Sequence, residues 1–94
     1  MIVGTCTIHL DIAPTHSLKE KRRLVKSVVA HVRNRFNVSI AEVDANEYWQ
    51  SAILGVACVA NSRERVHGTL SAVASYVEHL RLDVRLADYE IEIL

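Results

Sequence analysis

The order in which two kinds of apolar spacing follow one another most constrains the fold of this chain. Four segments show the alternation of period two that is typical of strands, and two show apolar residues three and four positions apart, as in helices. The predicted strands cover residues 2–12, 37–45, 51–60 and 82–93, and the predicted helices cover about 17–36 and 61–80. The order is therefore strand, helix, strand, strand, helix, strand.

This order predicts an α+β fold with the ferredoxin-like βαββαβ arrangement. Because crossover connections are right-handed, we expect an antiparallel sheet of order 4-1-3-2 with both helices on one face. The 94 residues contain no linker or repeat. We therefore expect residues 1–94 to form a single domain.

Two of the predicted strands contain a slip in their alternation. A β-bulge near Ala41 would reconcile the parity of Ile40 with that of Val43 in the second strand. The alternative is that the last part of this strand lies at an edge of the sheet. A second bulge or bend is expected between Leu86 and Tyr89 in the last strand.

Each predicted helix begins with a capping box and carries one apolar stripe. Ser17 with Glu20 caps the first helix, and Asn61 with Glu64 caps the second. The stripes consist of Leu18, Val25, Val28, Val32 and Phe36, and of Val66, Leu70, Val73, Val77 and Leu80. Gly68, inside the second predicted helix, destabilises the helix by about 1 kcal/mol relative to alanine. A glycine at such a position usually has a packing reason, so we expect Gly68 to permit close packing of the helix.

Composition bears on the charge, the state of the cysteines and the location of the protein, but it identifies no activity. The net charge is zero, so binding of a polyanion requires a local asymmetry of charge. Cys6 and Cys58 lie in apolar alternating segments, which favours buried free thiols over a disulfide. The chain has no signal-like start and no apolar run of about 18 residues, so we expect a cytoplasmic location.

The first predicted helix is the most basic segment and is the candidate nucleic-acid contact. The candidate phosphate-contacting residues are Lys19, Lys21, Arg22, Arg23, Lys26 and Arg33, with Trp49 as a candidate for base stacking. The alternative is a solvated helix face that pairs with Glu42, Asp44 or Glu47, and a tryptophan ring that covers the end of the core.

The second and third predicted strands suggest a protein partner. Residues 51–60 are apolar on both faces, so Leu54 and Val56, or their neighbours of opposite parity, would lie on the open face of the sheet. A homodimer is the expected cover, unless the exposed residues are small. Glu42 and Asp44 are predicted to share a strand face, as an acid–base pair, a cation site or partners in ion pairs.

Signatures of common activities are missing from the sequence. The five histidines lack zinc-like spacing, and no GxGxxG, Walker or HExxH motif occurs. The two central strands lack the aromatic residues of RNA-recognition motifs, and no GXXG loop of a KH domain is present. We therefore expect no catalytic residue, no metal and no cofactor.

Several motifs resemble the YlxP-like family of small bacterial proteins, a domain of unknown function. They are Ser17-Leu18-Lys19-Glu20-Lys21-Arg22-Arg23, Arg33-Asn34-Arg35-Phe36-Asn37-Val38-Ser39, Ala41-Glu42-Val43-Asp44, Trp49-Gln50-Ser51-Ala52 and Leu54-Gly55-Val56-Ala57. The resemblance implies a ferredoxin-like fold and genes that often lie near those of translation initiation and ribosome maturation factors. It supplies no catalytic residues.

Two functions stay open at this point. The first is a non-enzymatic accessory protein that associates with RNA or the ribosome through the basic helix. The second is a dimeric module that binds a protein or a small ligand, with Glu42, Asp44, Trp49 and Gln50 as candidate partner-binding residues.

Overall fold

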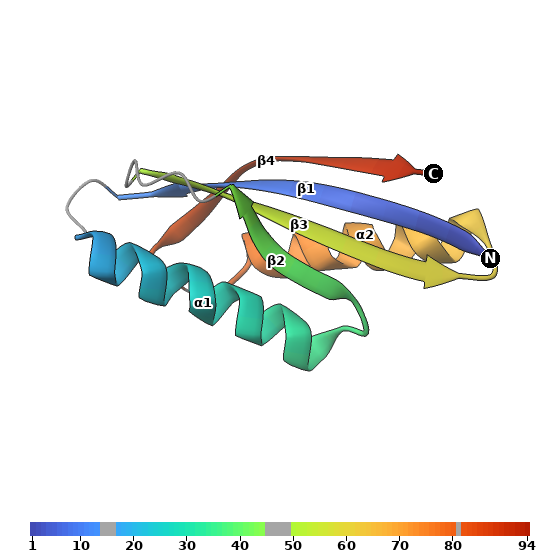
Figure 1. The fold of residues 1–94 in the computed structure, drawn as a ribbon, viewed down its shortest axis with the longest axis horizontal. Helices are drawn as coiled ribbons and strands as arrows, with labels where there is room; N and C mark the ends of the chain where they lie inside the picture. The colour runs from blue at the N-terminus through green and yellow to red at the C-terminus, as the bar shows by residue number, and fades with distance from the viewer. Residues whose placement is uncertain (14–16, 45–49, 81) are drawn as a thin grey trace.

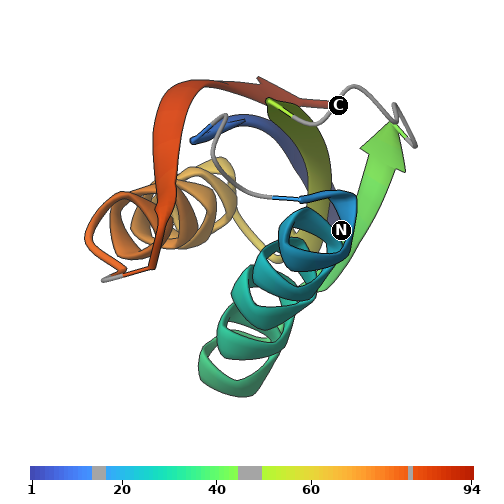
Figure 2. The same ribbon diagram turned by 90° about the vertical axis from the view of Figure 1, so that its left-hand side faces the viewer.

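The structure, a computed structural model, describes residues 1–13, 17–44, 50–80 and 82–94. It contains β1 (Ile2–Ile12), α1 (Leu18–Arg35), β2 (Ser39–Asp44), β3 (Ser51–Ala60), α2 (Arg63–Glu78) and β4 (Val84–Ile93). Figure 1 shows the two helices running along the sheet, and Figure 2 shows the sheet curving over both of them. The βαββαβ order predicted from the sequence is confirmed.

The sheet has the order β2-β3-β1-β4, which is the predicted order 4-1-3-2 read from the other edge. All three neighbouring pairs are antiparallel. The central strands β1 and β3 pair over their full length, from Ile2 opposite Ala60 to Asp11 opposite Ser51. The edge strands β2 and β4 therefore flank a long, regular centre.

The core lies between the helices and one face of this centre. The even-numbered residues of β1 and β3 are buried, except for the half-buried Ile2 and Ala60 at the strand ends. They meet the stripes predicted for the helices. The largest fully buried side chains include Ile8, Leu10, Leu54, Leu70 and Val28. Leu54 and Val56 thus face the helices, and the odd-numbered residues of β1 and β3 lie on the open face of the sheet.

Both predicted bulges are present, and one is displaced. In β4 the register shifts between Leu86, opposite Leu10, and Asp88, opposite His9. In β2 the shift falls between Glu42 and Asp44, at Val43 rather than near Ala41. Val43 covers Gly55, where a Cβ would lie 2.7 Å from Val43 Cγ1, so the bulge is held by a close contact across the strands.

The helix starts differ in how well the sequence predicted them. Ser17 caps α1, and its Oγ accepts a hydrogen bond from the Glu20 amide at 3.2 Å, as expected. The cap of α2 is Ser62, whose Oγ accepts from the Arg65 amide at 3.2 Å, so the assignment of Asn61 was wrong by one residue. Both residues suit a cap, and only the backbone angles distinguish them.

Candidate nucleic-acid interface

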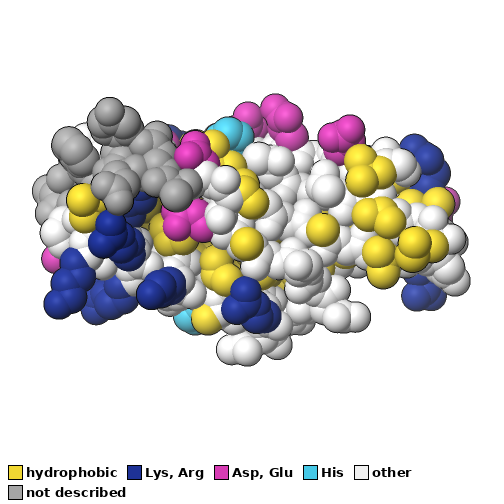
Figure 3. Space-filling view, in the orientation of Figure 1, with side chains coloured by type: hydrophobic (Ala, Val, Ile, Leu, Met, Phe, Trp, Pro, Cys, Tyr) yellow, Lys and Arg dark blue, Asp and Glu magenta, His cyan; other side chains and the backbone are white. Residues whose placement is uncertain are grey.

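Four candidate cations form one exposed surface on α1. Lys19, Arg22, Arg23 and Lys26 are exposed, and their spacing of three and four places them on the side of the helix opposite Val28. We call these four residues the α1 basic face. Figure 3 shows Lys and Arg side chains gathered over α1 and Asp and Glu side chains along the edge formed by β4.

Lys21 does not belong to this face. It is 4% exposed and lies on the buried stripe, between Leu18 and Val25 at spacings of three and four. Its burial removes Lys21 from the residues that can contact a partner directly, which corrects the prediction from the sequence. The helical spacing puts position 21 on the buried stripe, but lysine is rarely buried, so the sequence favoured an exposed Lys21.

Arg33 has a role inside the protein. Its Nη2 donates a hydrogen bond of 3.0 Å to the carbonyl oxygen of Ile40, the first buried residue of β2. This bond ties the last turn of α1 to the edge of the sheet. Arg33 therefore contributes to the fold as well as to the charge of α1.

The charges of the chain are separated between the two layers. The helices carry nine Lys and Arg residues and three Glu residues, a net charge of six positive. The strands carry six Asp and Glu residues and one arginine, a net charge of five negative. The net charge of zero thus conceals a basic helical layer and an acidic sheet, a local asymmetry of the kind that polyanion binding requires.

The acidic residues of β2 are not a pair. Glu42 lies opposite Leu54, on the face that carries the helices, whereas Asp44 lies opposite Ile53, on the open face. The bulge at Val43 separates the two carboxylates, so the prediction that they share a strand face was wrong. Both are exposed.

Gln50 and Trp49 were predicted to bind a partner or stack on a base. Gln50 is exposed, and its carbonyl oxygen accepts a hydrogen bond of 3.0 Å from the Ile12 amide, which joins the start of β3 to the end of β1. Trp49 and Glu47 lie outside the described residues.

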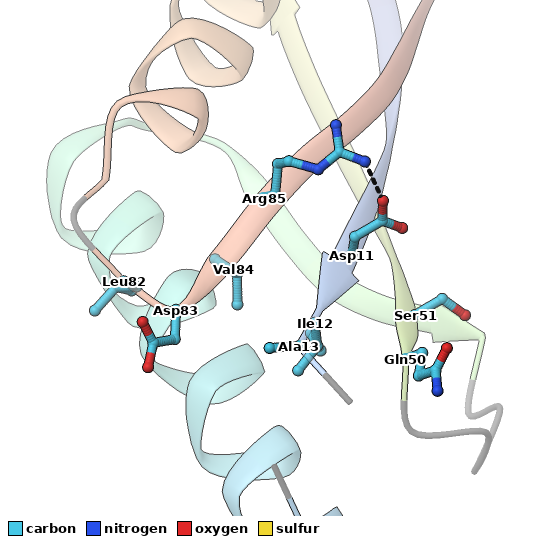
Figure 4. A pocket seen from close by; sticks show the side chains of 9 residues that line it. All are labelled: Asp11, Ile12, Ala13, Gln50, Ser51, Leu82, Asp83, Val84 and Arg85. Atoms are coloured by element: carbon cyan, nitrogen blue, oxygen red, sulfur yellow. Dashed lines mark hydrogen bonds and ion pairs between the residues drawn. The ribbon is translucent and has the colours of Figure 1, made fainter. Parts of the chain in front are cut away.

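A pocket of about 710 Å³ lies at the end of the sheet where α1 begins (Figure 4). Its lining includes Asp11, Gln50, Ser51, Asp83 and Arg85. Arg85 Nη2 donates to Asp11 Oδ2 at 2.5 Å, and this exposed ion pair forms one wall. Asp11 and Arg85 are 74 residues apart, so only the pairing of β1 with β4 brings them together.

The two cysteines are free and buried, as the alternation predicted. Burial raises the pKa of the Cys6 thiol from its ordinary value of 9.0 to about 11, and burial also raises the pKa of Cys58. The Cys58 thiol lies 3.8 Å from the carbonyl oxygen of Val66, to which it donates. Neutral, buried thiols are poor nucleophiles and poor metal ligands.

Within the described ranges, no three His, Cys, Asp or Glu residues are close enough to hold a metal ion together. Over the same ranges, no helix is long and apolar enough to cross a membrane.

The open face of the sheet has an apolar half and an acidic half. On β3 it carries Ile53, Gly55, Ala57 and Val59, and Val59 is 62% exposed. On β4 it carries Arg85, Asp88, Glu90 and Glu92, which pair across from Asp11, His9, Thr7 and Thr5. The exposed residues are therefore neither uniformly apolar nor uniformly small.

Two comparisons with known proteins agree on the family. Residues 3–91 match a family described as a protein of unknown function, DUF503. An uncharacterised protein of Bacillus subtilis strain 168, YlxP, is 34% identical over 77 residues, which cover 82% of this chain and 84% of the relative. The resemblance noted in the sequence is confirmed, and the chain belongs to the DUF503 family of proteins of unknown function.

Proposed function

We propose that this chain is a non-enzymatic cytoplasmic protein that contacts RNA, in the ribosome or its precursors, through the α1 basic face. The observation that carries the proposal is the separation of charge between the layers. A basic helical layer over an acidic sheet gives a protein of zero net charge one surface that attracts phosphates and one that repels them.

The α1 basic face has the chemistry that phosphate contact needs. Its four cations are exposed on one side of a helix that is fixed from behind by Val25, Val28 and Val32. Lysine and arginine side chains on such a face bind phosphate oxygens without reading a sequence. Trp49 remains a candidate for stacking on a base.

The test is co-sedimentation with ribosomal subunits from a bacterial lysate at low and high salt. The variant is Arg23→Gln/Lys26→Gln, which removes two positive charges from the α1 basic face. The matched control is Ser39→Glu/Ala41→Glu, which makes the same change in net charge at two exposed positions of β2. We expect the wild type and the control to pellet with subunits at low salt and the variant to stay in the supernatant.

Two results would overturn the proposal. One is a wild-type protein that does not pellet with subunits at low salt. The other is equal loss of binding in the variant and the control, because it would assign binding to net charge rather than to α1.

A second candidate function is a dimeric protein-interaction module that buries the open sheet face. Exposed Val43 and Val59, with half-buried Ile53 between them in sequence, favour it. Sedimentation equilibrium at micromolar concentration measures whether the protein is a monomer or a dimer. A dimer that Val59→Lys dissociates supports this function, and a monomeric wild type excludes it.

A further inference from the structure

A second pocket lies at the opposite end of α1 from the residues Lys19–Lys26, where α1 and β3 end and α2 begins. Its volume is about 590 Å³. Its polar lining consists of Arg35, Asn37, Arg65 and Thr69, and its apolar lining includes Phe36 and Val59. Among the described residues, no carboxylate lines it. The pocket therefore offers two positive charges and neutral hydrogen-bonding groups over an apolar floor.

Gly68 lines this pocket and has no packing reason to be glycine. A Cβ at this position would meet nothing within 4 Å, so the predicted role of Gly68 in close helix packing was wrong. A glycine inside α2 costs about 1 kcal/mol relative to alanine. What the glycine does provide is open space at the wall of the pocket.

Of the two arginines that line the pocket, one lies at a position where its charge is unfavourable. Arg65 is in the first turn of α2, where a cation opposes the helix dipole. Arg35 has its Cζ 5.5 Å from the centroid of the Tyr76 ring, and Tyr76 packs edge-to-face on Phe36 at 5.5 Å. Within residues 1–13, 17–44, 50–80 and 82–94, neither guanidinium forms an ion pair with a carboxylate. Arg35 itself is in the last turn of α1, where the helix dipole favours a cation. Arg65 and Gly68 each go against a preference of the helix and both line this cavity, which is typical of a binding site.

We propose that this pocket binds a phosphomonoester, the terminal phosphate of a small organic ligand. Two guanidinium groups match the charge of a phosphomonoester, which is close to two negative charges at neutral pH. Asn37 and Thr69 add neutral donors, and Phe36 and Val59 face the organic part. The volume lies within the range of small-molecule sites. The site is separate from the α1 basic face and does not depend on the function proposed for it.

The test is a titration of ¹⁵N-labelled protein with inorganic phosphate, adenosine 5′-monophosphate and adenosine, followed by amide chemical shifts. We expect saturable shifts at Gly68 and Thr69 with the monophosphate, weaker binding of phosphate, and no binding of adenosine. Arg65→Gln is expected to weaken binding of the monophosphate at least tenfold. Arg63→Gln, which removes a charge from the same turn but not from the pocket, is the matched control and is expected to bind like the wild type.

Gly68→Leu separates binding from folding. Leucine favours the helix over glycine, so this variant is expected to melt at or above the wild-type temperature, while its side chain fills the pocket and weakens binding at least tenfold. Any of three results would contradict the site: no shifts with phosphate or monophosphate, equal binding of adenosine, or equal losses in Arg63→Gln and Arg65→Gln. The Arg23→Gln/Lys26→Gln variant is expected to bind the monophosphate normally, so failure of the RNA proposal and failure of this one are distinguishable.

Discussion

At the scale of single residues, the two glycines Gly4 and Gly68 have opposite surroundings. Gly4 lies on the buried face of β1, where a Cβ would lie 2.3 Å from Val66 Cγ1 and 3.1 Å from Leu70 Cδ1. It lets α2 approach the sheet closely. Gly68 is in α2, and a Cβ at this position would meet no atom within 4 Å. The sequence did not reveal this difference, because it depends on what packs against each position.

We predict that Gly4→Ala destabilises the protein and Gly68→Ala stabilises it. Gly4→Ala forces α2 away from β1 and should lower the free energy of unfolding by about 1–3 kcal/mol. Gly68→Ala should raise it by about 1 kcal/mol, through helix propensity alone. Urea denaturation of the two variants measures both changes, and equal signs would contradict the assignment of the close contact to Gly4.

The raised pKa of Cys6 predicts a loss of stability in alkali. The folded pKa of about 11 lies above the ordinary 9.0 of an exposed thiol, so the unfolded chain releases this proton first as pH rises. The stabilising contribution of Cys6 is therefore complete below pH 9 and is lost between about pH 9 and 11. Thermal melts of wild type and Cys6→Ala across this range measure it. The difference in stability between the two should shrink as pH rises, and a constant difference would refute the shift.

At the scale of elements, the spacing of apolar residues predicted the strands and helices better than the type of single residues did. The bounds of β1 and β3 and both helical stripes follow from apolar spacing alone. The position of the β2 bulge did not, because a slip in parity shows that a residue is inserted but not which one. Lys21 was misread for a related reason: its spacing placed it in the buried stripe of α1, while its charge suggested the surface.

Arg33 provides a prediction about how α1 is attached to β2. Arg33→Lys keeps the charge but loses the planar donor that reaches the Ile40 carbonyl. It should lower the free energy of unfolding by about 1 kcal/mol and speed hydrogen exchange in β2. Arg23→Lys, an exposed substitution on the same helix, is the control and should change neither. Equal stability of the two variants would show that the Arg33 bond contributes nothing measurable.

At the scale of the whole molecule, the separation of charge was beyond sequence analysis. Composition gives a net charge of zero, and the basic helix was visible only as a local run. The acidic sheet appears once β1, β2 and β4 are brought into one sheet, because its six carboxylates come from three strands distant in sequence. The pairing of Asp11 with Arg85 and the pocket beside it emerge in the same way.

The most direct test of phosphate contact by the α1 basic face is the salt dependence of RNA binding. Binding of a fluorescent single-stranded ribosomal RNA fragment is measured by anisotropy between low and physiological salt. Four contacting cations predict a slope of log K against log salt of about −3, and Arg23→Gln/Lys26→Gln should reduce it to about −1.4. The Ser39→Glu/Ala41→Glu control should keep the wild-type slope. An unchanged slope in the α1 variant, or the same reduction in the control, would contradict the assignment of phosphate contact to α1.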